Sequence, residues 1–169
     1  VYLGNPLLKK ANVAQEFTQE QILEFMACKQ DPVYFAKQHV KIVSLDEGLV
    51  PFEPYDFQET LIRRFHQNRF NICKMPRQTG KSTTSVSYLL HYAVFNDNVN
   101  IGILANKAAT ARDLLGRLQT AYENLPKWMQ QGIISWNKGS LELENGSKIL
   151  AASTSASAVR GMSFNILFL

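Results

Sequence analysis

Apolar positions in the first part of the chain recur at helical spacing behind recognisable helix starts. Thr18 and Gln21 have the spacing of a capping box, and the apolar residues that follow share one face of a helix. Asp31 followed by Pro32 predicts the N-cap and the first position of a second, shorter helix. This pattern predicts a small helical subdomain over residues 1–48 that ends in an extended segment and a turn.

From residue 49 onward the apolar pattern alternates between helical and strand periods. Extended segments are expected at 41–45, 70–74, 100–104 and 165–169, and helical stripes of apolar residues within 57–65, 86–94 and 111–125. Asn145-Gly146 between two short apolar runs predicts a β-hairpin, and a Ser/Ala-rich loop over 153–158 follows it. Strands that alternate with helices predict an α/β domain over 49–169, with a largely parallel sheet covered on both faces.

Composition narrows the class of protein without fixing its function. Hydrophobic residues make up 46% of the chain and charged residues 19%, which is typical of a globular domain and carries no signature of disorder. Every apolar stretch is too short to span a membrane. The net charge of +4 is compatible with a polyanionic partner and does not require one. Cys28 and Cys73 are too few for a metal cluster or a disulfide framework, and we expect two buried free thiols in a reducing cytoplasm.

The stretch 75–82 carries the clearest chemistry in the chain. It reads Met-Pro-Arg-Gln-Thr-Gly-Lys-Ser and lies between an expected strand and an expected helix, the setting in which a Gly-Lys-Ser tripeptide binds phosphate. Gly80 lets the backbone approach the phosphates, Lys81 can reach their terminal oxygens, and the Ser82 hydroxyl can hold Mg²⁺. The predicted nucleotide-binding residues of this loop are Pro76, Arg77, Gln78, Thr79, Gly80, Lys81 and Ser82.

Two features of this loop point to a family. Met75 replaces the first glycine of the standard Walker A motif, and Arg77 lies inside the loop. In both respects the loop resembles that of the large terminase subunits of tailed bacteriophages. The resemblance implies a P-loop NTPase of the α/β class with a RecA-like parallel sheet, and makes the helical segment 1–48 a counterpart of the lid subdomain of that family.

A second similarity lies upstream of the loop. The run Tyr55-Asp56-Phe57-Gln58 is similar to the adenine-recognising Q motif that terminases share with related helicases. A glutamine amide such as Gln58 can donate to and accept from the adenine edge at once, and Tyr55 or Phe57 can stack on the base. The alternative is that Gln58 is an exposed helix residue and that the aromatic residues belong to the core.

Two later segments resemble the T-even-like myovirus branch of the terminases. The stretch 136–147 looks like the hairpin of these proteins, and 158–164 resembles the Arg-Gly segment that precedes their Walker B strand. The resemblance makes Arg160 a candidate for completing the ATP site of a neighbouring subunit, and Arg77 and Lys81 are the other two predicted catalytic residues. The alternative for Arg160 is a structural arginine that bonds loop carbonyls.

The resemblance implies a motor that uses ATP and Mg²⁺ to move double-stranded DNA into the procapsid. Its expected partners are DNA, the portal protein and a small terminase subunit. Its expected form is a homo-oligomeric ring at the procapsid portal, in the cytoplasm of the infected bacterium and away from any membrane. A superfamily 2 helicase shares the Q motif and Walker A, but Arg77 and the run Val159-Arg160-Gly161 favour the terminase. A non-catalytic nucleotide-binding or oligomerisation module is a third alternative.

The last residues fit a Walker B strand without its acidic pair. The segment 165–169 is apolar, and the Asp-Glu pair that holds Mg²⁺ and orients water would follow it. The upstream pair Asp46-Glu47 precedes the loop and is better explained as a turn. We therefore expect a core truncated before Walker B whose own ATP turnover is slow or absent, with the nuclease domain of the family beyond Leu169.

Overall fold

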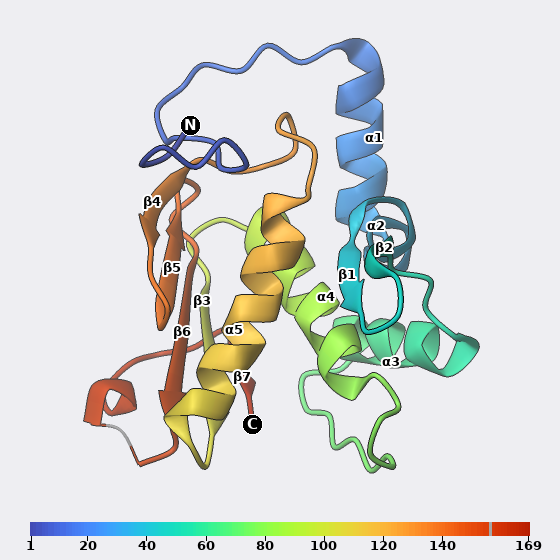
Figure 1. Ribbon diagram of the computed structural model, residues 1–169, viewed down its shortest axis with the longest axis vertical. Coiled ribbons are helices and arrows are strands. Elements are labelled where there is room, and N and C mark those ends of the chain that lie inside the picture. Colours follow the sequence, from blue (N-terminus) through green and yellow to red (C-terminus); the bar gives the residue numbers. More distant parts are fainter. Residues whose placement is uncertain (156) are drawn as a thin grey trace.

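The computed structural model describes residues 1–155 and 157–169; Ala156, within the expected Ser/Ala-rich loop, lies outside the described residues. The α-helices are α1 (Gln19–Gln30), α2 (Pro32–His39), α3 (Asp56–Gln67), α4 (Lys81–Phe95) and α5 (Ala108–Glu123). The strands are β1 (Lys41–Ser44), β2 (Gly48–Pro51), β3 (Asn100–Ala105), β4 (Ile133–Trp136), β5 (Ser140–Leu143), β6 (Lys148–Ser153) and β7 (Ile166–Phe168). A 3-10 helix spans Ser157–Val159, between β6 and β7 (Figure 1).

The main sheet has five strands in the order β4-β5-β6-β3-β7. β3 pairs in parallel with β6 and β7, whereas the pairs β4-β5 and β5-β6 are antiparallel. The expected α/β class is confirmed, but the sheet is mixed rather than largely parallel. The reason is the turn at Asn145-Gly146, which folds β5 back along β6 and gives β4 an antiparallel neighbour. The sequence did not predict β4, because so short a segment is fixed by its pairing with β5.

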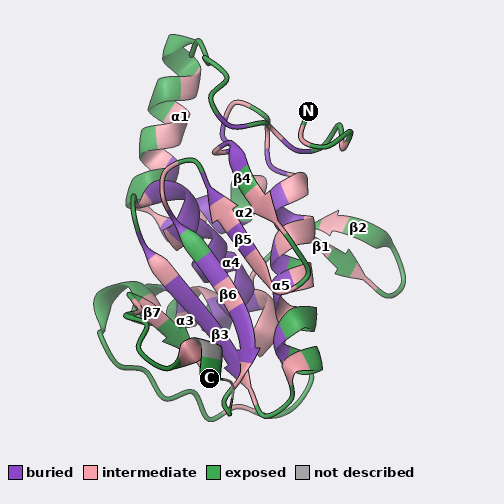
Figure 2. Cartoon of the chain, turned by 90° about the vertical axis from the view of Figure 1, so that its left-hand side faces the viewer, coloured by how far each residue is buried: buried purple, intermediate pink, exposed green. Residues whose placement is uncertain are grey.

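The helices lie on one face of this sheet. α5 packs against β3 and β6, and α4 packs against α5. In Figure 2 the strands are nearest the viewer, with both helices behind them. The expectation of helices on both faces is therefore wrong for residues 1–155 and 157–169. None of the helices in these ranges combines the length and the apolar character needed to cross a membrane.

The local signals for helix starts are confirmed. Thr18 Oγ1 accepts a hydrogen bond from the backbone N–H of Gln21 at 3.2 Å, and the Gln21 side chain accepts one from the backbone of Thr18 at 3.1 Å. Asp31 Oδ1 accepts from the backbone N–H groups of Val33 and Tyr34. Each cap satisfies donors that a helix leaves unpaired, so these starts follow from a few neighbouring residues.

Residues 70–74 do not form the expected strand. Phe70 is 83% exposed and Ile72 is fully exposed, at 100%. Strand formation depends on contacts with a neighbouring strand, and none of the described strands pairs with this segment. The segment is instead an irregular connection from α3 to the loop before α4. Cys73 lies in it and is exposed, so the expectation of a buried thiol is wrong there, whereas Cys28 is buried as expected.

The N-terminal segment lies beside the sheet. Lys10 forms a parallel bridge with Ile133 of β4, and Leu8 is buried in the main core. That core joins residues from both sides of position 48, and the β1-β2 hairpin passes through this position. The division of the chain at residue 48 stays a prediction.

Candidate phosphate-binding site

The first turn of α4 offers backbone donors without a side-chain cap. Its N-cap, Gly80, has a left-handed φ of 72° and forms no capping hydrogen bond through a side chain. The N–H groups of residues 81–83 have no acceptor within the helix, because an α-helix leaves its first donors unpaired. The first turn also contains no acidic residue. Together with the helix dipole, these features make this end of α4 favourable for an anion.

The loop before α4 is held by its own side chains. Gln78 has a positive φ of 61°, which turns the chain towards the helix. Thr79 Oγ1 donates to the carbonyl of Pro76 at 3.0 Å. Lys81 Nζ donates to the carbonyls of Met75, at 2.9 Å, and Pro76, at 2.5 Å. An ammonium group has three donors, so Lys81 keeps one for a ligand and can exchange the other two.

A cavity of about 320 Å³ lies at this loop. Its lining consists of residues 78–83, which include Ser82, and of Arg117 from α5. A guanidinium nitrogen of Arg117 lies 3.2 Å from a carboxylate oxygen of Asp113, one turn earlier on the same helix. The sequence did not predict Arg117, because an exposed arginine with a partner at this spacing has the signature of an ordinary surface ion pair. Only the packing of α5 on α4 brings it to the loop.

A second cavity of similar volume, about 320 Å³, lies against β5 and β6. Met162 and Phe164 supply part of its lining, and so do Glu142 and Lys148, whose charged groups lie 3.4 Å apart. These charges compensate each other, and no helix begins there. The chemistry suited to phosphate therefore belongs to the cavity at α4.

Gln58 is brought to the loop, as the sequence predicts. Its side chain is buried, and its Nε2 donates to the carbonyl of Thr79 at 3.3 Å. Its Oε1 accepts from the backbone N–H of Tyr55 at 2.9 Å, at the start of α3. A Cβ on Gly80 would displace Gln58 Nε2, the end of a flexible side chain, and the positive φ at this position favours glycine. The alternative of an exposed helix residue is wrong for Gln58.

Tyr55 and Phe57 form an exposed aromatic pair beside Gln58. Their ring centroids lie 5.8 Å apart with an interplanar angle of 13°. Tyr55 is 70% exposed and Phe57 is 45% exposed, so neither belongs to the core. Exposed rings next to the loop before α4 are suited to stacking on a base, which stays a prediction.

The two arginines predicted to act in catalysis lie in different places. Arg77 lies in the loop itself and is exposed. Arg160 is exposed in the turn after the 3-10 helix, where its backbone N–H donates to the carbonyl of Ser157 at 3.0 Å. In Figure 1 this turn is at the lower left, whereas the connection that leads into α4 is at the lower right. The chain therefore does not bring the 3-10 turn to the loop before α4.

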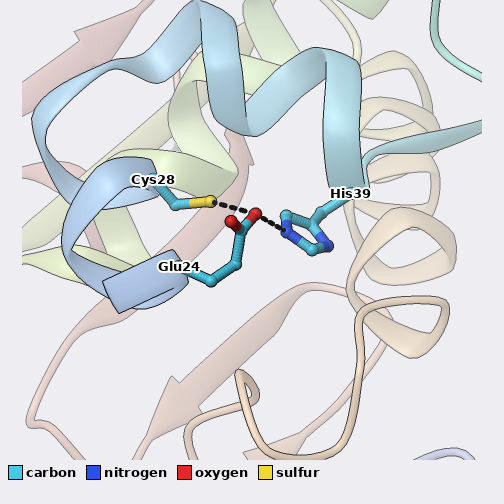
Figure 3. A group of neighbouring side chains, drawn as sticks. All are labelled: Glu24, Cys28 and His39. Carbon is cyan, nitrogen blue, oxygen red and sulfur yellow. Dashed lines mark hydrogen bonds and ion pairs between the residues drawn. The ribbon is translucent and has the colours of Figure 1, made fainter. Parts of the chain in front are cut away.

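A separate polar cluster joins α1 to α2. Glu24 Oε1 lies 2.7 Å from His39 Nε2 and 3.6 Å from the Cys28 sulfur (Figure 3). Glu24 Oε2 also accepts from the Tyr34 hydroxyl at 2.9 Å. Within the described part of the chain, Glu24, Cys28 and His39 are also the one group whose metal-binding atoms all lie within 4.8 Å of one another.

The charges of this cluster fit a hydrogen-bonded unit. Burial raises the pKa of Glu24, but the hydrogen bonds from His39 and Tyr34 outweigh it and hold the pKa below its ordinary value of 4.5. Burial and the Glu24 charge raise the pKa of the Cys28 thiol to about 12. Cys28 is therefore a neutral donor near pH 7. All three donors share one carboxylate, so the cluster is satisfied by its own hydrogen bonds.

The chain is similar to known proteins both in its fold and in its sequence. In three dimensions the chain is similar to the large terminase of bacteriophage HK97, with a TM-score of 0.66 and 18% sequence identity. The similarity covers 82% of this chain and 30% of the HK97 chain, so this protein spans less than a third of that terminase. Residues 72–169 match the family described as terminase large subunit, T4likevirus-type, N-terminal. Since this match covers more than half of the sequence, the chain belongs to the T4likevirus-type large terminase family.

Proposed function

We propose that this chain binds ATP and Mg²⁺ at the loop before α4, as the RecA-like P-loop core of a DNA-packaging motor. The observation that carries the proposal is the uncapped start of α4, which lines one cavity together with Lys81 and Ser82. Backbone donors, an ammonium group and a hydroxyl at one helix end are the chemistry that a nucleotide phosphate bound to Mg²⁺ requires. Family membership and the fold similarity to a phage terminase support the same function.

Each residue of the site has a proposed task. The backbone of residues 76–80 would wrap the phosphates, with Lys81 on their terminal oxygens and the Ser82 hydroxyl on Mg²⁺. Gln58 would read the adenine edge, since its amide already lies at the loop, and the exposed ring of Tyr55 would stack on the base. Arg77, inside the loop, would stabilise the charge that develops on the phosphates during hydrolysis.

Membership of the terminase family supports a role in a DNA-packaging motor. We infer that hydrolysis of ATP drives double-stranded DNA into the procapsid, and that the protein works as a ring with a portal protein and a small terminase subunit. It would do so at the portal, in the cytoplasm of the infected bacterium. The family match weighs against a superfamily 2 helicase, and the fold similarity to a phage terminase agrees with that choice.

ATP binding can be tested directly with Lys81→Ala. Hydrogen bonds to charged groups contribute about 1.5–3 kcal/mol each, so we expect affinity for a fluorescent ATP analogue to fall at least about tenfold. Lys74→Ala is the matched control, because Lys74 is exposed, carries the same charge and lies outside the cavity lining. Equal affinity in the wild type and Lys81→Ala would refute the proposed site, as would an equal loss in both variants.

A further inference from the structure

The cavity at the start of α4 collects positive charge from two helices. Within residues 1–155 and 157–169, Arg117 is the one lining residue that lies outside the segment 78–83. The cavity thus combines the Lys81 ammonium, the unpaired N–H groups of α4 and the Arg117 guanidinium, and none of the described residues that line it is acidic. Like charges around one cavity repel each other, and a bound anion removes that cost.

The contact between Arg117 and Asp113 leaves the guanidinium available. The side chains of Arg117 and Asp113 are 55% and 64% exposed, and they lie one turn apart on a single helix. Exposed ion pairs of this kind contribute little to stability, because water and salt screen them. A guanidinium also has five donors in a planar fork, of which one close contact to Asp113 uses only part.

We propose that Arg117 binds the phosphate groups of a nucleotide held by residues 78–83 of the same chain. This proposal rests on the proposed nucleotide-binding function and adds to it a phosphate-binding residue from α5. The fork of an arginine matches two oxygens of a phosphate at once, which a lysine does only as a point charge. Because the contact is to phosphate, it contributes equally to the binding of ATP, GTP and inorganic tripolyphosphate.

The test compares Arg117→Ala, Arg117→Lys and Arg112→Ala in one competition assay. A fluorescent ATP analogue is displaced by ATP, GTP or tripolyphosphate. We expect Arg117→Ala to weaken all three at least about tenfold and Arg117→Lys to give an intermediate loss. Arg112→Ala removes the same charge from the same helix, but Arg112 does not line the cavity and its Nε bonds the carbonyl of Ala108. Its affinities should stay close to those of the wild type.

Five outcomes would overturn the proposal. Wild-type affinity in Arg117→Ala would show that Arg117 does not contact the ligand. An equal loss of affinity in Arg112→Ala would show an effect of net charge alone. A loss for ATP and GTP but not for tripolyphosphate would place the contact on base or sugar. Wild-type affinity in Lys81→Ala, or no binding by the wild type, would refute the nucleotide site and this proposal with it. Arg117→Lys decides the matter if Arg117→Ala fails to fold.

Discussion

The side-chain amide of Gln58 forms hydrogen bonds both at the start of α3 and to the loop before α4. Its oxygen accepts from the backbone of Tyr55, and its nitrogen donates to the carbonyl of Thr79. A glutamine amide can donate twice and accept twice, so each atom retains a further bonding position. Reading a base is therefore compatible with anchoring the loop, and a comparison of two bases separates these roles.

We expect Gln58→Ala to weaken ATP binding more than GTP binding. Loss of the Thr79 contact lowers both affinities equally, whereas loss of the base contact lowers only that for adenine, because guanine presents the opposite polarity. The preference for ATP should fall by about 1–3 kcal/mol, measured by competition against a fluorescent analogue. If the wild type shows no preference, or the variant keeps it unchanged, the Q-motif assignment is wrong.

His91 predicts how stability depends on pH. Its Nε2 lies 2.8 Å from the carbonyl of Cys28, and it is buried among aromatic rings, including those of Phe35 and Phe95. Burial lowers the pKa of His91 from its ordinary value of 6.5 to about 4. Between these values the unfolded chain binds a proton that the folded chain does not. The stability contributed by neutral His91 is therefore present above pH 6.5 and is lost as the pH falls towards 4.

Denaturant unfolding at pH 7.5 and pH 5 should show this loss in the wild type, with about 2 kcal/mol attributable to His91. His91→Gln is the control, since it can still donate to the Cys28 carbonyl but does not titrate. Other acidic and histidine side chains titrate in both proteins, so the difference between the two pH dependences isolates residue 91. The same slope in both would contradict the prediction.

The site residues that sequence could identify are those inside short motifs. Lys81 and Ser82 follow from eight consecutive residues, and Gln58 follows from a four-residue run. Arg117 could not be found this way, because its place depends on how α5 packs along α4. A motif records local geometry, whereas a residue contributed by a neighbouring helix becomes visible only in the folded chain.

At the scale of elements, the two ends of α4 differ in whether side chains bond their unpaired backbone groups. Its start lacks a side-chain cap, whereas its end is closed by a distant turn. Asn145 Nδ2 donates to the carbonyls of Ala93, at 2.9 Å, and Asn96, at 3.1 Å, and Ser147 Oγ donates to that of Asn96 at 2.7 Å. The hairpin turn therefore satisfies carbonyls that α4 leaves unpaired.

Asn145→Asp should destabilise the protein by about 1–3 kcal/mol. Aspartate suits this turn nearly as well as asparagine, but it cannot donate to the helix and adds negative charge at the negative end of α4. Ser147→Ala removes a single donor and should cost less. Denaturant unfolding at neutral pH measures both variants, and a wild-type stability for Asn145→Asp would exclude the capping role.

Elements with local signals could be predicted, and elements that need a distant partner could not. The capping box at Thr18, the N-cap at Asp31 and the turn at Asn145-Gly146 each depend on neighbouring residues and are confirmed. The segment 70–74 is as apolar as a strand but pairs with none of the described strands. The hydrogen bonds from Asn145 to the end of α4 could not be predicted for the same reason, since the residues that accept them lie about fifty positions away in the sequence.

At the scale of the whole molecule, the position of Arg160 is informative. The turn that carries it is at the lower left of Figure 1, and the connection into α4 is at the lower right. We therefore expect Arg160 to act at the loop before α4 of a neighbouring subunit rather than at that of its own chain. Arg77 lies in the loop before α4, so we expect it to contact phosphates bound by its own chain. In the proposed ring, the two arginines would thus act at the ATP sites of different subunits.

These two roles can be tested in a complete large terminase that carries these residues. The test mixes two inactive variants so that they assemble into one ring. An arginine that contacts the negative charge developing on a phosphate contributes roughly 10³–10⁵ in rate, so Arg160→Ala and Arg77→Ala should each be nearly inactive in ATP hydrolysis. Lys81→Ala should be nearly inactive as well, because it loses the ammonium group proposed to contact the terminal phosphate oxygens. Mixing Arg160→Ala with Lys81→Ala should restore activity, because an intact loop then meets an intact arginine from its neighbour. Mixing Arg77→Ala with Lys81→Ala should restore none, since both changes damage the same loop. Recovery in the Arg77 mixture, or its absence in a co-assembled Arg160 mixture, would reverse the assignment.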